Sequence, residues 1–478
     1  MGLGISNWRL ARAVSTLGQL GVVSGTAIDL ILIRRLQAGD PGGHMRRALA
    51  AFPVPRVADR LLARYFIEGG TSPRQPFATK PMVGETHGQP LAELLVASNF
   101  VEVHLAKEGH GGMVGINYLH KIQTPTLPSL LGAMLAGCDV VLMGAGIPVE
   151  IPTCLDRLSR GEKVAFDLHV TGATQAHIQS LDPAELLPEI SFPLPRPRFL
   201  PIISSATLAT MLLKKSKGRI DGFVVEEPSA GGHNAPPRGP LKLSPAGEPV
   251  YGPRDAVDTA ALRALGLPFW LAGSYGSPER VAQACAAGAA GIPSGTLFAF
   301  CDESGLRDDL KRSTIREAVH GTPHVFRDPL ASPTGFPFQV LSMPGTLSEP
   351  AIYADRCRQC DLGYLREAYE RPDGTLGWRC PAEDPQSYVK KGGKIEDTLG
   401  RKCLCNGLMA NIGLGQLRDG KEEPPLVTCG EDLSGIAAVL PPGRSSYSAA
   451  EVIGYLLSES GVPLPAGRGG VSADPHPA

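Results

Sequence analysis

The sequence lacks long apolar runs and any strong excess of charge. No stretch reaches the roughly 18 consecutive apolar residues that a transmembrane helix needs. Residues 1–9 lack the charged region, apolar core and cleavage site of a secretory signal. With 46 basic and 47 acidic residues the formal net charge is −1, so no overall field attracts nucleic acid or anionic lipid. We therefore expect a cytoplasmic protein with a small-molecule substrate and no nucleic-acid or membrane partner; a homo-oligomer stays open.

The length and the apolar content favour one large α/β unit with additions. The chain has 478 residues, of which 43% are hydrophobic. A (β/α)8 TIM barrel takes about 250 residues, which leaves room for insertions and a further segment. No internal repeat of solenoid period is present. The fold class that we predict is therefore α/β.

Seven short apolar runs alternate with helical patterns. Runs of this kind are typical of parallel strands that are buried on both faces. A closed (β/α)8 barrel needs eight strands, so one is missing. Because a glycine-rich loop follows Met1 at once, we expect the first strand to lie upstream of this start or another segment to close the barrel. The seven runs are residues 19–24, 113–117, 139–143, 199–204, 221–225, 268–272 and 289–292.

Changes in composition divide the chain into three parts. Residues 1–327 are the predicted TIM barrel, with a mostly helical insertion at 27–103 and a second insertion at 150–198. Residues 328–432 are rich in Pro, Gly and Cys, and we expect loops there. Residues 433–478 are expected to form a helix and then a flexible, disordered tail.

Three of the predicted strands end in glycines with a neighbouring histidine or hydroxyl residue. Glycines let a backbone approach a phosphate closely, and a (β/α)8 barrel holds phosphate in the loops after its seventh and eighth strands. The alternative is that such glycines only make tight turns between strand and helix. Agreement among three strand ends favours one phosphate site, formed by Gly231, Gly232, Gly273, Ser274, Gly276, Gly295 and Thr296.

The order and spacing of these pieces resemble the nitronate monooxygenase family, formerly called 2-nitropropane dioxygenases, which are FMN-dependent barrels. The related flavin enoyl reductases of fatty-acid and polyketide synthesis share the pattern. The resemblance covers about residues 1–320 and does not choose between the two reactions. Besides the two phosphate segments, the matching pieces are the Met1-Gly2-Leu3-Gly4 loop, residues 17–23, Val114-Gly115-Ile116-Asn117, Gly144-Ala145-Gly146-Ile147-Pro148, Ile203-Ser204-Ser205-Ala206 and Ala230-Gly231-Gly232-His233.

The resemblance implies bound FMN. Its phosphate would lie on Gly232, Gly273, Ser274, Gly276, Gly295 and Thr296, with Asn117 and Ser205 near the flavin or ribityl chain; we also assign Gly2, Glu226 and Gly231 to cofactor binding. Two positions depart from the family pattern. Ser274 stands where a second glycine is expected, and Pro293-Ser294-Gly295-Thr296 replaces the usual Gln-Met-Gly-Thr. Because proline has no N–H group, one phosphate contact is lost there.

His233 is the predicted catalytic residue. It resembles the histidine that faces the substrate in nitronate monooxygenases. As a general base or a hydrogen-bond donor, it would take a proton from the carbon next to a nitro group or hold the nitronate oxygens. The alternative is a structural histidine that caps a turn. His120 and Lys121, which follow the second run, are further candidates for substrate contact, or else lie in a solvated loop.

Six of the ten cysteines fall between residues 357 and 429, a pattern that favours a metal site. A Cys-x2-Cys pair can place two thiolates on one ion, and a Cys-x-Cys pair can complete a tetrahedral set. Zinc and an iron–sulfur cluster are both open, because the spacing matches neither common motif. Unligated thiols are the alternative reading. The six predicted ligands are Cys357, Cys360, Cys380, Cys403, Cys405 and Cys429.

Three functions follow. The first is an FMN-dependent oxidoreductase, nitronate monooxygenase-like, that oxidises an activated small substrate such as an alkyl nitronate with O2. The second is an NAD(P)H-dependent flavin enoyl reductase that acts on enoyl thioesters in fatty-acid or polyketide synthesis. The third is a barrel scaffold that carries a zinc-ribbon interaction module. Acidic residues interrupt the basic ones in that module, which argues against a nucleic-acid surface.

Overall fold

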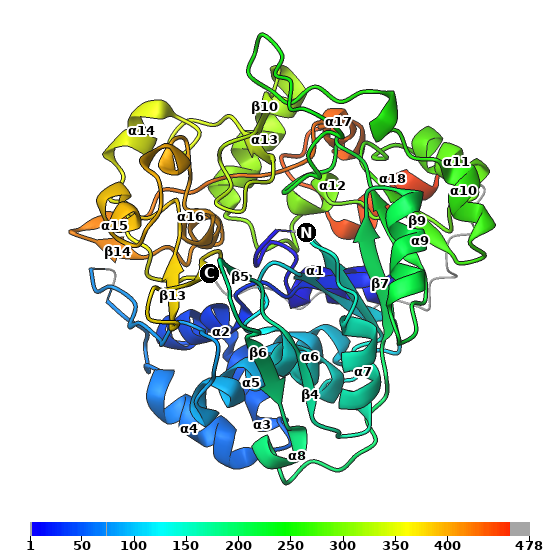
Figure 1. The fold of residues 1–478 in the computed structure, drawn as a ribbon. Helices are drawn as coiled ribbons and strands as arrows, with labels where there is room; N and C mark the ends of the chain where they lie inside the picture. The colour runs from blue at the N-terminus through cyan, green and yellow to red at the C-terminus, as the bar shows by residue number, and fades with distance from the viewer. Residues whose placement is uncertain (1, 73, 459–478) are drawn as a thin grey trace.

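A curled parallel sheet of six strands forms the centre of the protein (Figure 1). The computed structural model describes residues 2–72 and 74–458, so the predicted disordered tail lies outside the described residues. Neighbouring strands are parallel throughout, in the order β1-β2-β3-β7-β8-β9. Their bounds are β1 (Gly21–Ser24), β2 (Val114–Leu119), β3 (Val140–Gly144), β7 (Arg198–Ile203), β8 (Phe223–Glu226) and β9 (Phe269–Ala272).

All seven predicted runs contribute to this sheet. Strand β3, with the sequence Val-Val-Leu-Met-Gly, is buried at every position, as expected for a strand that is covered on both faces. The seventh run, residues 289–292, is a one-residue continuation beside β9. Gly291 forms a parallel bridge with Trp270, and the N–H of Ala290 donates to the carbonyl of Phe269 at 2.8 Å.

The described residues do not close the sheet into a barrel. A loop, rather than a strand, covers the outer edge of β1. The Ser6 hydroxyl donates to the carbonyl of Val22 at 2.5 Å, and the N–H of Ser24 donates to the carbonyl of Ser6 at 2.8 Å. Gly4 has φ 61°, a turn conformation that cannot continue a strand. The predicted closed (β/α)8 barrel is therefore not formed by residues 2–72 and 74–458, which give a mixed α/β fold with an open curled sheet.

Helices cover the outer face of the sheet. Several begin at polar residues that cap them: Ser205 accepts the N–H of Leu208, and Ser277 accepts the N–H of Arg280. Their apolar sides and the outward side chains of the strands form the largest core. These helices are α1 (Trp8–Thr16), α6 (Thr126–Leu135), α7 (Ile151–Ser159), α9 (Ala206–Lys215), α10 (Thr259–Ala264) and α11 (Pro278–Ala286).

The first insertion is mostly helical, as predicted, and the second contains both helices and short strands. The long helix α5 runs directly into β2 and is buried along most of its length. In the second insertion, β4 and β6 form an antiparallel pair. The elements are α2 (Ile28–Gln37), α3 (His44–Ala50), α4 (Pro55–Tyr65) and α5 (Gln89–Lys107), then β4 (Val164–Asp167), β5 (Val170–Thr171), β6 (Ile178–Leu181) and α8 (Pro183–Leu186).

The segment 328–432 is not the coreless loop that its composition predicted. It forms short elements with its own buried side chains, including Leu404, Met409 and Leu426, which are at most 1% exposed. Strand β12 joins this segment to the second insertion, because it pairs in parallel with β5. Its elements are β10 (Val325–Asp328), β11 (Phe338–Leu341), α14 (Pro350–Asp355), β12 (Glu367–Glu370), β13 (Leu376–Arg379), α15 (Pro385–Lys390), α16 (Leu404–Asn411), β14 (Leu417–Arg418) and β15 (Lys421–Glu422).

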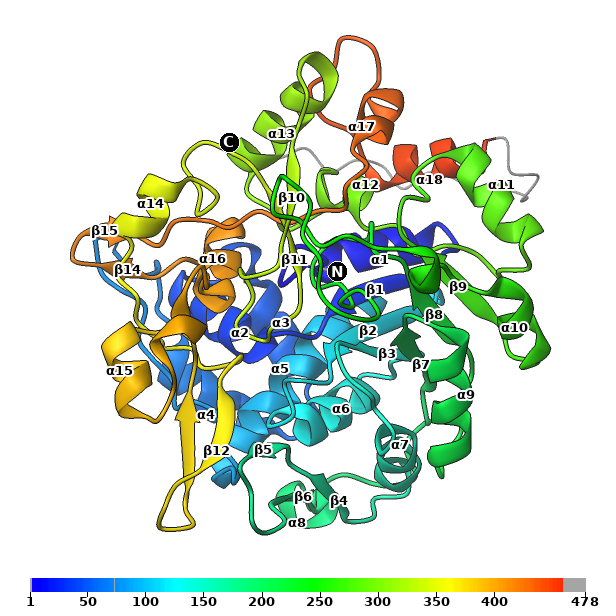
Figure 2. The same ribbon diagram turned by 45° about the horizontal axis from the view of Figure 1, so that its top comes forward.

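The remaining helices form a second core beside the open edge of the sheet. Figure 2 shows α13, α17 and α18 together above the strands. Helix α18 packs against α1 and α11, and the Ser448 and Glu451 side chains form a capping box at its start. These helices are α12 (Thr296–Ala299), α13 (Asp308–His320), α17 (Ser434–Val439) and α18 (Ala449–Leu457).

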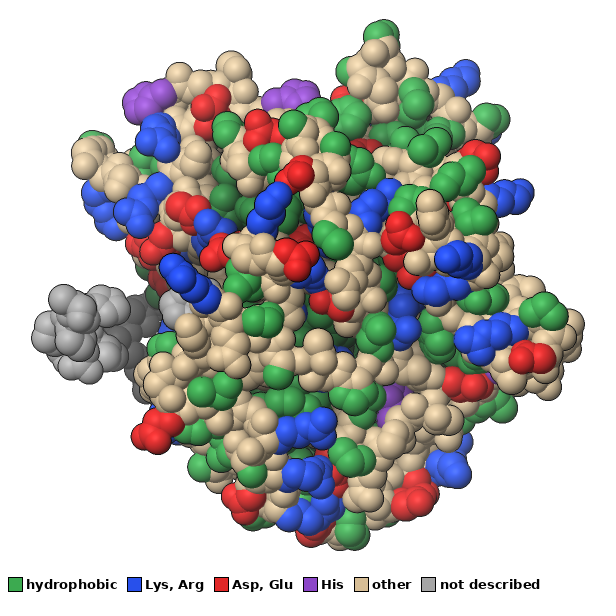
Figure 3. Space-filling model, turned by 90° about the vertical axis from the view of Figure 1, so that its left-hand side faces the viewer, with side chains coloured by type: hydrophobic (Ala, Val, Ile, Leu, Met, Phe, Trp, Pro, Cys, Tyr) green, Lys and Arg blue, Asp and Glu red, His purple; other side chains and the backbone are tan. Residues whose placement is uncertain are grey.

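Charges of both signs are mixed on the face that includes the C-terminal segment (Figure 3). Basic side chains there pair with acidic ones, as in Arg379 with Glu367 and Lys391 with Glu383. This face therefore carries no basic stripe of the kind that nucleic acid requires. Among the described residues, no helix is long and apolar enough to cross a membrane.

Candidate active site

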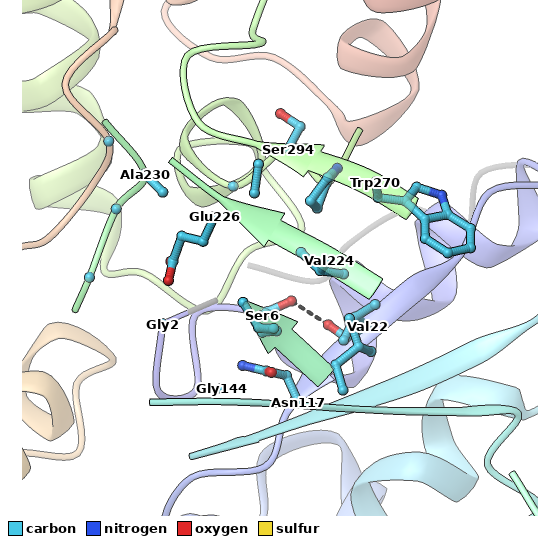
Figure 4. Close-up of a pocket in the computed structure, with 18 of the residues that line it drawn as sticks. Gly2, Ser6, Val22, Asn117, Gly144, Val224, Glu226, Ala230, Trp270 and Ser294 are labelled. Atoms are coloured by element: carbon cyan, nitrogen blue, oxygen red, sulfur yellow. Dashed lines mark hydrogen bonds between the residues drawn. The ribbon is translucent and has the colours of Figure 1, made fainter. Parts of the chain in front are cut away.

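One cavity of about 930 Å³ lies at the carboxyl ends of the strands and continues between them (Figure 4). This volume falls within the roughly 300–1,000 Å³ of typical small-molecule sites. Its inner wall consists of side chains that point inward from the strands, among them Val140, Leu200 and Val224. Figure 4 shows Glu226 and Asn117 reaching into the same space from β8 and β2.

The C-terminal segment supplies a further wall, which the sequence interpretation did not anticipate. Its lining side chains are mostly apolar. They include Phe336, Phe338, Tyr364, Leu365, Leu404, Cys405 and Leu408. The sheet and the segment 328–432 therefore build one site together.

Free backbone N–H groups gather on the β9 side of the cavity. Among the described residues, the N–H groups of Gly276, Ser294 and Gly295 donate to no protein acceptor. Pro293 offers none, as its ring predicts. A Cβ atom on Gly295 would meet no atom within 4 Å, so the loop leaves open space there. Clustered N–H groups of this kind favour an anion such as a phosphate.

Three of the other predicted phosphate contacts already have partners within the protein. The N–H of Gly232 donates to Thr428 Oγ1 at 3.2 Å, and that of Ser274 donates to Ser229 Oγ at 3.1 Å. The hydroxyl of Thr296 accepts the N–H of Gly430 at 2.9 Å. These bonds shape the loops, whereas the N–H groups of Gly276, Ser294 and Gly295, like those of Gly231 and Gly273, donate to no acceptor among the described residues.

Most of the predicted site residues line this single cavity. The exception is Ser205, whose hydroxyl caps α9 and which does not line the cavity. The predicted residues that do line it are Gly2, Asn117, Glu226, Gly231, Gly232, His233, Gly273, Ser274, Gly276, Gly295 and Thr296. Residues from five separate parts of the chain thus meet at one place.

Two polar side chains in the cavity lack protein partners. Asn117 Oδ1 is buried and accepts no hydrogen bond from the described residues. Burial raises the pKa of Glu226 to about 7, so this carboxyl is partly protonated near neutral pH. An unpaired amide oxygen and a carboxyl group that is close to neutral are suited to a polar ring with N–H and C=O groups.

His233 is held by the segment after the sheet. Its Nε2 lies 2.7 Å from Ser332 Oγ, and its ring meets the ring of Phe338 edge to face at 4.9 Å. Burial and, secondarily, the charge of Lys121 lower the pKa of His233 to about 4, so the imidazole is neutral at physiological pH. Its Nδ1 has no hydrogen-bond partner among the described residues. His233 can therefore offer Nδ1 to a bound molecule.

A short network behind His233 fixes its orientation. Ser332 Oγ accepts the N–H of Thr334 at 3.2 Å and lies 2.8 Å from Thr334 Oγ1. Lys121 Nζ donates to the Thr334 carbonyl at 2.9 Å and lies 3.9 Å from the centre of the Phe336 ring. His120 pairs with Glu150 at 3.9 Å and does not line the cavity. Of these two candidates, only Lys121 adjoins His233.

The cysteines do not form the predicted metal site. No group of three or more His, Cys, Asp or Glu residues in the described parts of the chain could hold a metal ion. Cys357 is exposed, and Cys429 is buried in a different core beside Gly231, so these two are separated from the others. The tetrahedral set that was expected from the Cys-x2-Cys and Cys-x-Cys pairs is therefore not supported, and the chain turns Cys357 and Cys429 toward different surroundings.

Sequence reasoning missed the residues after 327 that complete the site, above all Ser332, Phe336, Phe338 and Thr428. The apolar run from Phe336 to Leu341 is a strand signal that could have been found. The segment that pairs with this strand could not have been found in the same way, because His233 and Phe338, which form the contact, lie far apart in the sequence.

The residues present fit FMN. Free N–H groups at Gly276, Ser294 and Gly295 suit its phosphate, the unpaired Asn117 oxygen suits an N–H group of its ring, and the cavity is large enough for the ring and a substrate.

No family model and no curated protein matches the chain. Solved structures that resemble it include FabK from Thermotoga maritima, at 15% identity and a TM-score of 0.45, covering 96% of this chain and 91% of that one. A nitroalkane oxidase from Streptomyces ansochromogenes has 13% identity and a TM-score of 0.47, with 96% and 93% covered. The enoyl reductase domain of MlnA from the macrolactin cluster of Bacillus amyloliquefaciens has 12% identity and a TM-score of 0.41, with 87% and 92% covered. At such values the activity has to be inferred from the site itself.

Ser332→Ala should change the tautomer of His233. Ser332 Oγ accepts the N–H of Thr334, and we assign its own proton to the bond with His233 Nε2, which leaves the proton of the ring on Nδ1. Without this hydroxyl the ring should shift toward the Nε2–H form that prevails in water. Nitrogen NMR of labelled histidine reports the change, Ser332→Thr should retain the original tautomer, and identical spectra for wild type and Ser332→Ala would contradict the assignment.

Glu226→Gln should stabilise the flavin-free protein at alkaline pH only. Since the folded-state pKa is raised from 4.5 to about 7, the folded protein retains a proton that the unfolded chain has lost, and its stability falls as the pH rises through this window. The variant has no such titration, so its Tm relative to wild type should be higher at pH 8 than at pH 5. The exposed Glu68→Gln is the control; an equal difference at both pH values would refute the shift.

Proposed function

We propose that the protein is an FMN-dependent oxidoreductase of the nitronate monooxygenase type, which oxidises an alkyl nitronate with O2. The observation that carries the proposal is the joint placement of free phosphate donors and a neutral, half-buried histidine on one cavity. The phosphate donors are the N–H groups of Gly276 and Gly295, and the histidine is His233. When it is bound, the flavin supplies the redox chemistry, accepting electrons from the substrate carbon and passing them to O2.

Different residues of the cavity would bind the phosphate, orient the ring, exclude water and hold the substrate. The N–H groups of Gly276, Ser294 and Gly295 would hold the phosphate, and Asn117 would orient the ring. The apolar side chains from the C-terminal segment would exclude water from the reacting carbon. His233 Nδ1 would then hold the polar end of the substrate.

The low pKa of His233 favours a substrate that is already ionised, because the neutral ring is a weak base. A base with a pKa of about 4 is a weak acceptor for a proton on carbon, because efficient general bases titrate near the operating pH. As a neutral donor through Nδ1–H, the ring is better suited to binding the oxygens of a nitronate that arrives already deprotonated. We therefore favour the nitronate anion over the parent nitroalkane.

The alternative function is an NAD(P)H-dependent flavin enoyl reductase that acts on enoyl thioesters. The apolar wall of Phe336, Leu365 and Leu408 favours it, because such a wall accommodates an alkyl chain. In that reaction His233 would face the thioester rather than a nitro group. Both functions use the same cofactor position.

A carboxylate at position 295 should repel the phosphate. Gly295 has φ −113° and ψ −53°, which any residue can adopt, and its Cβ would point into open space, so substitution should not disturb the loop. Gly295→Asp should weaken FMN binding by about tenfold or more through charge repulsion, whereas the isosteric Gly295→Asn should weaken it much less.

Riboflavin provides the matched ligand for this pair of variants, since it lacks the phosphate. Its affinity, measured by equilibrium fluorescence titration, should be similar in Gly295→Asp and Gly295→Asn. Equal losses of FMN affinity in the two variants, or an equal loss for riboflavin, would place the phosphate elsewhere.

His233→Ala should retain FMN and lose turnover. Anaerobic stopped-flow mixing of the wild type with an alkyl nitronate should bleach the flavin, and the variant should bleach at least about 100-fold more slowly, in keeping with the loss of a positioned polar catalytic group. Bleaching of the wild type by NADPH but not by nitronate would exclude the first function and support the enoyl reductase. Unchanged rates in His233→Ala would remove this residue from either mechanism.

A further inference from the structure

Four cysteines from three parts of the C-terminal segment lie in one small cluster. They line a second cavity of about 10 Å³, together with Leu362 and Ala382, and Leu365, Leu404 and Cys405 line both this cavity and the large one. Within the cluster, Cys380 and Cys403 are 5% and 8% exposed. The four cysteines are Cys360, Cys380, Cys403 and Cys405.

Cys360 and Cys380 belong to the same packed cluster. The side chain of Cys360 packs against the cluster that holds Cys380, whereas Cys403 accepts a hydrogen bond from Asn406 Nδ2 at 3.5 Å. Both Cys360 and Cys380 are free thiols. Two free thiols that pack in one cluster are placed to form a disulfide.

The two thiols differ in accessibility. Cys360 is half-buried and Cys380 is buried, so an external reagent reaches Cys360 first. This asymmetry suits an attacking thiolate with a resolving partner.

We propose that Cys360 and Cys380 are a reversible dithiol–disulfide centre that reacts with small-molecule disulfides. The Cys360 thiolate attacks one sulfur of the disulfide RSSR, which forms a mixed disulfide and releases RS⁻. Cys380 then loses its proton and attacks the Cys360 sulfur, which forms the Cys360–Cys380 bond and releases the second RS⁻. The protein loses two electrons, and RSSR gains them to become two thiols.

The bond would close the segment between Cys360 and Cys380 into a loop. This loop contains Tyr364 and Leu365, which line the large cavity, and strand β12, which pairs with β5. Because a cross-link restricts the unfolded chain, oxidation should also raise the Tm. Oxidation of the centre would therefore cross-link the segment that forms this wall of the large cavity. This effect does not depend on which reaction occurs in that cavity.

The experiment treats the full-length protein with oxidised glutathione under native conditions and then quenches it in acid. Non-reducing peptide mass spectrometry should show Cys360 linked to Cys380, whereas the exposed Cys285 and Cys357 should carry glutathione adducts at most. Dithiothreitol should restore both thiols and reverse the rise in Tm.

Variants separate this pair from the other thiols. Cys380→Ser should stop at a stable glutathione adduct on Cys360, whereas Cys285→Ser, which changes an exposed thiol on α11, should form the bond as the wild type does. If Cys380→Ser does not fold, the peptide map of the wild type decides alone. A bond between other cysteines, no loss of thiols, or tightly bound zinc that protects all four thiols would each overturn the proposal.

Discussion

The site depends on the pairing of the loop after β8 with the start of β11. The N–H of Asn234 donates to the Pro337 carbonyl at 3.0 Å, and the N–H of Gln339 donates to the Gly232 carbonyl at 2.9 Å. His233 lies between these two bonds, so its backbone position is fixed from both sides. The same pairing brings the segment 328–432 over the cavity, where its apolar side chains replace water. Without it, His233 would be an ordinary residue of a solvent-exposed loop, with no reason for its low pKa.

The strands could be predicted because their sequences are constrained on both faces. A run such as Val-Val-Leu-Met-Gly has no polar side to expose, and all seven predicted runs contribute to the sheet. Whether the sheet closes into a barrel could not be predicted, because this depends on what pairs with the outer edge of β1. At that edge the Ser6 hydroxyl, rather than another strand, donates to the carbonyl of Val22. The core of the segment 328–432 was missed because its apolar residues, such as Leu404 and Leu426, are spread among glycines and prolines without a regular period.

The cavity residues from Asn117 to Thr296 were recognisable from motifs at strand ends, where local sequence and function coincide. The pairing of each N–H group was not, because it depends on distant partners: Thr428 takes the N–H of Gly232, and Ser229 takes that of Ser274. The cysteine pattern was misread for a related reason. Sequence spacing shows which thiols can approach one another, but the chain path places Cys429 in another core and leaves four thiols around an apolar void.

The visible absorption spectrum of the purified protein tests whether the cavity at the strand ends holds FMN. The protein, as isolated or after incubation with FMN and removal of the excess, should show flavin bands near about 370 and 450 nm at one flavin per chain. A colourless protein that retains no FMN after that incubation would contradict FMN binding there.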